Sequence, residues 1–141
     1  MSPLSKTTST VLTYAGALPF WLLLMAPQTL FGVDTTEAYL AYGAVISAFM
    51  AGTLWGVAQM GKAGIATIVA SNVLALLSFA TLLLQPPALA AGIQLVVFGM
   101  LLLADRIVFA GDAERRWYLR LRTGVTVVVA LAYVAMLYRL A

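Results

Sequence analysis

Apolar positions fill long segments of this chain, and polar positions gather in short stretches between them. Each apolar segment has about the 20 residues that a helix needs to cross a bilayer. The pattern predicts an all-α fold, a polytopic integral membrane bundle that forms one transmembrane domain over residues 1–141. Its five transmembrane helices are expected at about residues 8–30, 35–59, 64–85, 87–109 and 113–139.

The third and fourth spans are predicted from a stretch without any charge. Residues 63–104 contain no Asp, Glu, Lys or Arg. As one helix they would measure about 63 Å, roughly twice the thickness of a hydrocarbon core. Gln85-Pro86-Pro87 is the expected break, because the residue before a proline avoids the helical conformation and proline suits the first turn of a helix. Spans 3 and 4 should therefore form a tight antiparallel hairpin.

Local signals set the ends of the other spans. The N-terminal residues lack the features of a cleaved signal peptide, so the first span is expected to be retained, with its cap at Thr8–Thr10. Pro19 removes one backbone hydrogen bond inside this span and predicts a kink about one turn earlier. Asp34, with an acidic residue three positions later, has the spacing of a capping box for span 2. Asp112 is the expected cap of span 5.

Basic residues lie almost entirely on one side of the predicted spans. Short loops rich in Lys and Arg stay in the cytoplasm. The distribution predicts an N-terminus inside, a C-terminus outside and a multi-pass protein of the bacterial inner (cytoplasmic) membrane. Only Arg139 falls on the outer side, whereas the inner side holds Lys6, Lys62, Arg106, Arg115, Arg116, Arg120 and Arg122.

Composition excludes several classes of function. The chain is 63% hydrophobic and 9% charged, and it contains no Cys and no His, which removes disulfides, thiolate catalysis, Cys/His zinc sites and His-ligated haem. Asp105 has no second carboxylate nearby, so we expect no enzyme and no cofactor, and a copper site built from the scattered methionines is disfavoured. The net charge of +3 reflects basic residues beside spans. The expected partner is therefore the lipid bilayer and not nucleic acid.

Small residues recur at every fourth position of span 2. They are Ala44, Ala48, Gly52 and Gly56. Such a stripe lets another helix approach closely in a membrane. The favoured interpretation is a structural helix-packing seam, and the alternative is a groove in which a ligand touches the backbone.

Polar and aromatic side chains in the inner half of the spans are the candidates for binding a ligand or a partner, because such groups usually face the bundle interior. Tyr14, Thr53 and Asn72 fall about 8–14 Å from the inner ends of their spans and are expected to share a level. Trp117 and Tyr118 belong to the interfacial aromatic belt. The full candidate set is Tyr14, Thr53, Trp55, Asn72, Asp105, Arg106, Trp117 and Tyr118.

A purely structural role for these residues is an open alternative. Asn72 would then hydrogen-bond the backbone freed by Pro19, and Asp105 would pair with an arginine at the start of span 5. The candidate arginines are Arg116, Arg120 and Arg122. On the outer side a second polar layer is expected to be core packing with satisfied hydroxyls, and it consists of Tyr42, Ser78, Gln94 and Tyr133.

Three motifs carry a family resemblance: TYAGALPFWLL in span 1, AYGAVISAFMAGTLWG in span 2, and ADR followed by WYLRLRTGV across the connection between spans 4 and 5. With them the chain resembles a family of small five-span membrane proteins of unknown function that includes the mitochondrial transmembrane protein sixty-nine and bacterial relatives. Leu54 stands where many members of that family carry His, so no imidazole role carries over. The resemblance implies a fold and a membrane location without an activity.

Two functions remain for a protein with these features. The first is a non-enzymatic accessory or scaffold subunit that associates with a larger membrane complex or with further copies of itself. The second is a small carrier or binding protein that holds a hydrophobic ligand, such as a quinone, a lipid or a tetrapyrrole, between span 1 and spans 2 and 3. The sequence slightly favours the first, because so few buried polar groups are available to position a substrate.

Overall fold

Five long helices make up most of the computed structural model, which describes residues 2–141. All five are long and apolar enough to cross a membrane, the third when its short 3-10 extension is included. The helices are α1 (Pro3–Met25), α2 (Thr35–Gln59), α3 (Ile65–Ala80), α4 (Pro87–Val108) and α5 (Arg116–Leu140). The short elements are the strands β1 (Thr29–Leu30) and β2 (Val33–Asp34) and the 3-10 helices η1 (Thr81–Leu83) and η2 (Ala113–Arg115).

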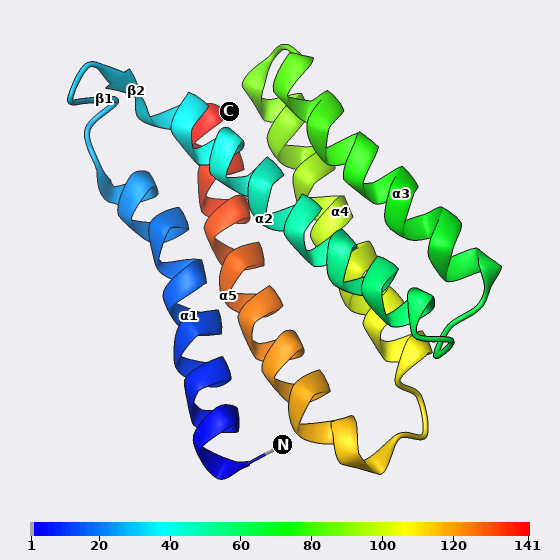
Figure 1. Cartoon of the computed structure of the whole chain (residues 1–141). Coiled ribbons are helices and arrows are strands. Elements are labelled where there is room, and N and C mark those ends of the chain that lie inside the picture. The colour runs from blue at the N-terminus through cyan, green and yellow to red at the C-terminus, as the bar shows by residue number, and fades with distance from the viewer. Residues whose placement is uncertain (1) are drawn as a thin grey trace.

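Helix α2 is the centre of the bundle. It packs against α1, α3 and α4. The last helix, α5, packs against α4 and against the first helix, α1, and so closes the bundle. The N-terminus and the C-terminus lie at opposite ends of the bundle, as an odd number of spans requires (Figure 1).

Helix α1 starts and ends earlier than expected. Ser2 caps it through a hydrogen bond from the Ser5 amide, and a proline follows at the first helical position, where its missing N–H costs nothing. The predicted cap at Thr8–Thr10 is wrong, since the hydroxyls of Thr8 and Thr10 donate to carbonyls of their own helix. After Met25 the chain forms the β1–β2 hairpin instead of a further helical turn.

Pro19 leaves α1 unbroken from Pro3 to Met25. Tyr42 of α2 donates its hydroxyl to the carbonyl of Gly16 at 2.6 Å, one turn before the proline. Asn72 does not reach this region, because its side-chain amide donates to Ile68 of its own helix. The proposed bond between Asn72 and the backbone near the proline is therefore wrong.

The turn and cap signals mark the other helix boundaries. The chain reverses at Gln85–Pro87, and Pro87 opens α4 as predicted, although α3 itself ends at Ala80. The Asp34 carboxylate accepts hydrogen bonds from the first amides of α2, as expected. Asp112 caps η2 through the Glu114 amide, so that α5 proper starts at Arg116, slightly later than expected.

Aromatic rings fill the core in the half of the bundle that holds the C-terminus. Phe20 lies 5.2 Å from the ring of Tyr39 and 6.0 Å from that of Phe98, both edge-on, and Tyr133 contacts all three. Such pairs each add about 0.5–1.5 kcal/mol beyond their buried area. Gln94 crosses this core, accepting from the Tyr133 hydroxyl and donating to the Thr81 hydroxyl and the Leu40 carbonyl. The outer polar layer is thus core packing with satisfied hydrogen bonds.

The glycine of α2 with the tightest side-chain packing lies beside the predicted stripe of small residues. Gly43 takes this place, because a Cβ there would collide with the Tyr133 hydroxyl and the Gln94 carbonyl oxygen. The buried face of α2 continues through Ser47, Ala51, Leu54 and Ala58.

In the predicted stripe, Ala44 is buried, Ala48 and Gly56 are half-buried, and Gly52 is exposed. A Cβ on Gly52 or Gly56 meets nothing within 4 Å. The true seam is therefore turned by one residue, about 100° of helix rotation, and the prediction that both glycines pack closely within the bundle is wrong.

Candidate functional site

Five of the eight candidate residues fall into two groups. Thr53, Trp117 and Tyr118 line one cavity between α1, α2 and α5. Trp55 and Asn72 lie on the other face of α2, where a shallow depression of about 280 Å³ separates it from α3. The structure therefore does not bring Tyr14, Thr53 and Asn72, which were expected to share a level, together in one site. Tyr14 belongs to neither group and lies across Gly124 of α5.

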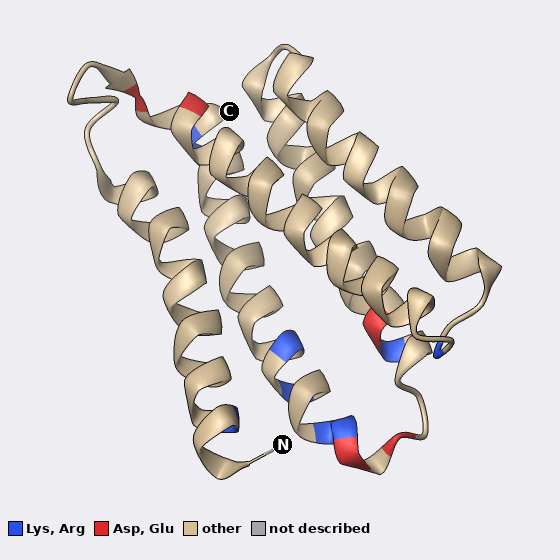
Figure 2. Ribbon diagram, in the orientation of Figure 1, with Lys and Arg blue, Asp and Glu red and all other residues tan. Residues whose placement is uncertain are grey.

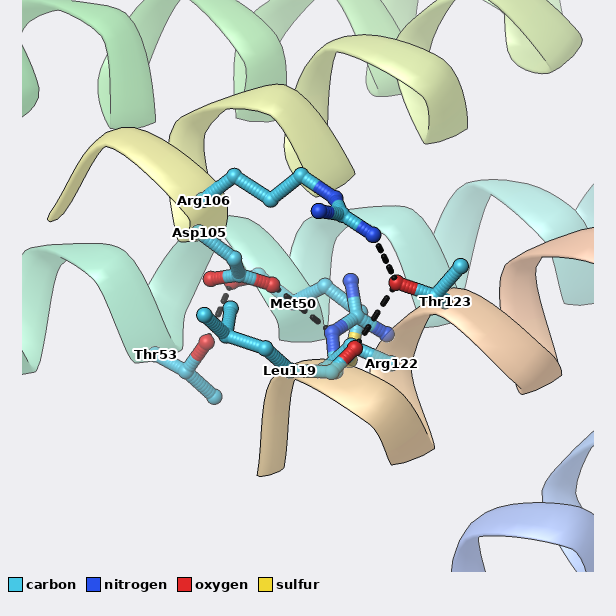
Figure 3. Close-up of polar contacts among 7 residues, drawn as sticks. All are labelled: Met50, Thr53, Asp105, Arg106, Leu119, Arg122 and Thr123. Atoms are coloured by element: carbon cyan, nitrogen blue, oxygen red, sulfur yellow. Dashed lines mark hydrogen bonds and ion pairs between the residues drawn. The ribbon is translucent and has the colours of Figure 1, made fainter. Parts of the chain in front are cut away.

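Asp105 and Arg122 form a buried ion pair between α4 and α5. The Nε of Arg122 donates to Oδ2 of Asp105 at 2.7 Å, and each side chain is only 4% exposed (Figure 3). Arg116 and Arg120 are exposed, so the structure selects Arg122 from the three candidate partners. The pairing predicted for Asp105 is confirmed.

A second contact between α4 and α5 lies next to this pair. Arg106 donates to the hydroxyl of Thr123 at 2.8 Å, and Thr123 in turn donates to the Leu119 carbonyl (Figure 3). Both residues follow directly after the members of the ion pair in sequence. Arg106 thus braces the connection and does not face the cavity, because it is absent from the residues that line it.

The cavity has a volume of about 450 Å³ and is mostly apolar. That volume falls within the usual range of small-molecule sites. Most of its wall comes from α1 and α5, with α2 on the third side and Phe98 of α4 at the back. The lining residues are Ser9, Leu12, Thr13, Gly16, Ala17, Phe20, Ile46, Phe49, Met50, Thr53, Phe98, Arg115, Trp117, Tyr118, Leu121, Arg122, Val125, Thr126 and Val129.

The cavity opens sideways, between α1 and α2. Its rim includes Leu12 of α1, 66% exposed, and Phe49 of α2, 67% exposed, whereas Phe20, Phe98 and Val129 at its deep end are buried. Figure 1 shows these two helices diverging toward the end of the bundle that holds the N-terminus.

One end of the cavity is polar. Arg115, Trp117 and Arg122 lie toward the end of the bundle at which the basic residues gather, which we call the basic end (Figure 2). Lys6 lies over the Trp117 ring at 5.5 Å, joining the start of α1 to the start of α5. The cavity thus has a cationic end and an apolar end.

Arg122 keeps hydrogen-bonding capacity that the protein does not use. Its guanidinium makes one hydrogen bond within residues 2–141, through Nε to Asp105. The Thr126 hydroxyl, one helical turn later, makes none with the same residues. Over that range the Tyr39 hydroxyl is the single fully enclosed side-chain polar atom without a partner. The terminal nitrogens of Arg122 and the hydroxyl of Thr126 are therefore not fully enclosed, and both residues line the cavity.

The cavity-facing side of α5 was missed in the sequence. Arg122, Val125, Thr126 and Val129 follow the spacing i, i+3, i+4, i+7, which places them on one helix face. Arg120 does not belong to this helix face, and the spacing that distinguishes it from Arg122 can be read from the sequence. What the sequence did not contain was the adjacency of α1 to α5.

The polar groups that line the cavity are hydrogen-bonding groups. Two arginines, three threonines and a serine supply hydrogen bonds, and no carboxylate lines it. Within residues 2–141 no three Asp or Glu side chains gather as metal ligands. The arrangement suits an elongated molecule with an apolar body and a hydrogen-bonding head.

The fold and the cavity define a class: a five-helix bundle, each helix long and apolar enough to cross a membrane, with a laterally open pocket at its basic end. The chain belongs to the family described as "Protein of unknown function (DUF3429)", which matches residues 5–138. No curated protein and no solved structure matches the chain.

Proposed function

We propose that this protein is a non-enzymatic binding protein for a long-chain hydrophobic ligand, which it holds in the cavity between α1, α2 and α5. The observation that carries the proposal is the lateral opening between Leu12 and Phe49 into a mostly apolar cavity of about 450 Å³. A cavity of this size left empty in a core is costly, because its walls lose van der Waals contacts. A resident ligand or an acyl chain restores those contacts.

The proposed setting is the bacterial inner membrane, with the N-terminus inside and the C-terminus outside. Seven basic and three acidic residues lie toward the basic end, and short basic segments stay cytoplasmic. The resemblance to bacterial relatives of the mitochondrial transmembrane protein sixty-nine supports the same location. In this orientation the cavity opens toward the cytoplasmic leaflet.

The function can be tested by filling the cavity. Ile46 is half-buried and lines it, whereas the neighbouring Val45 is 64% exposed and does not. Ile46→Trp should lower the amount of lipid or quinone that co-purifies with the protein at least about threefold, because the indole takes up space the ligand needs. Val45→Trp is the matched control and should leave that amount unchanged. Mass spectrometry of the organic extract measures both.

If the wild-type protein carries no hydrophobic molecule after mild purification and binds none added back, the binding function is wrong. Equal ligand content in the Ile46→Trp and Val45→Trp variants would instead move the ligand to another surface.

An accessory or scaffold role is a second candidate, and the depression between α2 and α3 favours it. Gly52, Trp55 and Asn72 lie there on the surface of the bundle, with Gly52 open to contact. A small residue beside a polar amide and an indole is typical of helix contacts in membranes. Another membrane protein or a second copy of the chain are the partners this surface suits.

A further inference from the structure

We infer that the ligand of the cavity is an anionic phospholipid, whose acidic head lies at Arg122 and Arg115 and one of whose two acyl chains runs along α5 toward Phe20 and Phe98. This inference rests on the binding function proposed above and specifies the ligand class. It concerns the same cavity and states which end holds the charged head of the ligand and which end holds its chain.

Arg122 is held in place by its ion pair and keeps unused hydrogen-bond donors. Its Nε is paired with Asp105, so its position is fixed, and its terminal nitrogens make no hydrogen bond within residues 2–141. Arg122 is also one of the residues that line the cavity. A guanidinium held at one nitrogen presents its remaining donors in a defined plane, the geometry that suits phosphate oxygens. The Thr126 hydroxyl one turn away adds a further donor on the same wall.

The polar end of the cavity carries positive charge. Asp105 offsets the charge of Arg122 but does not line the cavity, and Arg115 has no carboxylate within ion-pair distance in residues 2–141. Arg115 instead lies 5.8 Å from the centroid of the Phe109 ring. With Lys6 over Trp117 the polar end has an excess of positive charge, which favours an anion over a neutral or zwitterionic head.

The cavity is elongated along α5. From Trp117 to Val129 the cavity wall extends along about 18 Å of α5, at 1.5 Å per residue. It becomes entirely apolar toward Ala17, Phe20 and Phe98, all of them buried. A bare anion would leave this part unfilled, and a fully apolar molecule would leave the arginine donors unpaired. Only an amphiphile satisfies both ends.

The test uses the full chain in a neutral detergent, stripped of lipid and titrated with dioleoyl phosphatidylglycerol or dioleoyl phosphatidylcholine under native mass spectrometry. The two lipids share their chains and their phosphate and differ in net charge. We expect phosphatidylglycerol to bind at least about tenfold more tightly, the range of a charge-assisted contact. Inorganic phosphate alone, at millimolar concentration, should not displace it, because it lacks the chain.

Two arginines of the same cluster supply the matched variants. Arg115 lines the cavity, whereas Arg120 is exposed on another face of α5. Arg115→Gln should reduce the affinity for phosphatidylglycerol about three- to tenfold, and Arg120→Gln should leave it unchanged. Because Arg122→Gln alone strands Asp105, Arg122 is tested in the double variant Asp105→Asn, Arg122→Gln, which should lose the preference for the anionic lipid.

The outcomes separate the two proposals. Equal affinity for both lipids, reduced by Ile46→Trp, overturns the acidic head and leaves the hydrophobic site in place. Equal losses in Arg115→Gln and Arg120→Gln show a diffuse surface attraction and also overturn the inference. Displacement by inorganic phosphate alone assigns the site to a free anion. Binding of neither lipid removes this inference, and with it the binding function if quinones fail as well.

Discussion

At the scale of single residues, the physics of burial identified a partner for Asp105 but not which arginine it is. A carboxylate in an apolar helix needs a cation nearby, and the candidates considered were the arginines at the start of α5. The choice of Arg122 depends on helix phase, because it shares the inward face with Val125 and Val129 whereas Arg120 points outward. Asn72 shows the limit of such arguments, since its own helix satisfied it locally.

Removing the charge of Asp105 should destabilise the protein. Asp105→Asn leaves Arg122 buried without a counter-charge, and breaking a buried pair from one side typically costs about 3–5 kcal/mol. We expect a loss in this range in the free energy of unfolding, measured by denaturant titration in mixed micelles. Glu114→Gln, at an exposed acidic position near the same end, is the control and should change stability little.

The exchange Asp105→Arg with Arg122→Asp should recover part of the loss. An Asp105→Asn variant as stable as the wild type would show that the pair does not hold α4 to α5.

At the level of helices, the sequence predicted where each helix begins and ends better than it predicted which face of a helix points inward. Prolines and capping carboxylates marked the α3–α4 hairpin and the starts of α2 and η2. The rotation of α2 was wrong by one residue because a helix that is apolar on all sides gives no signal of its inward face. The inward face is marked by Gly43, where the large side chains of Tyr133 and Gln94 leave no room for a Cβ. A rule based on residue spacing within α2 does not predict this contact.

The corrected rotation of α2 changes the expectation for Gly52. Gly52→Leu should leave the folded bundle at least as stable as the wild type, since nothing lies within 4 Å of the new Cβ and leucine favours a helix more than glycine does. If the α2–α3 depression docks a partner helix, the same change abolishes assembly. Thermal unfolding and size-exclusion chromatography in detergent measure the two effects separately.

The control is Gly99→Leu on α4, also exposed with open space around its Cβ. A large loss of stability in Gly52→Leu alone would mean that the predicted seam is a close contact within the bundle after all.

At the scale of the whole molecule, five helices followed from hydropathy, but their neighbours did not. Consecutive helices were expected to enclose a ligand between spans 1, 2 and 3. The structure instead brings α5 beside α1, and the cavity forms between the first, second and last helices. Contacts between distant segments depend on how all five helices pack together, which local patterns do not specify.

The proposed binding function requires that all five helices cross the membrane with the basic end in the cytoplasm, because the cavity is formed by α1, α2 and α5 together. Paired alkaline phosphatase and fluorescent-protein fusions after Ala141 and at Gly111 test it directly. We predict that the Ala141 fusion reports the periplasm and the Gly111 fusion the cytoplasm. If both fusions report the same compartment, α5 does not cross the membrane and the five-span account is contradicted.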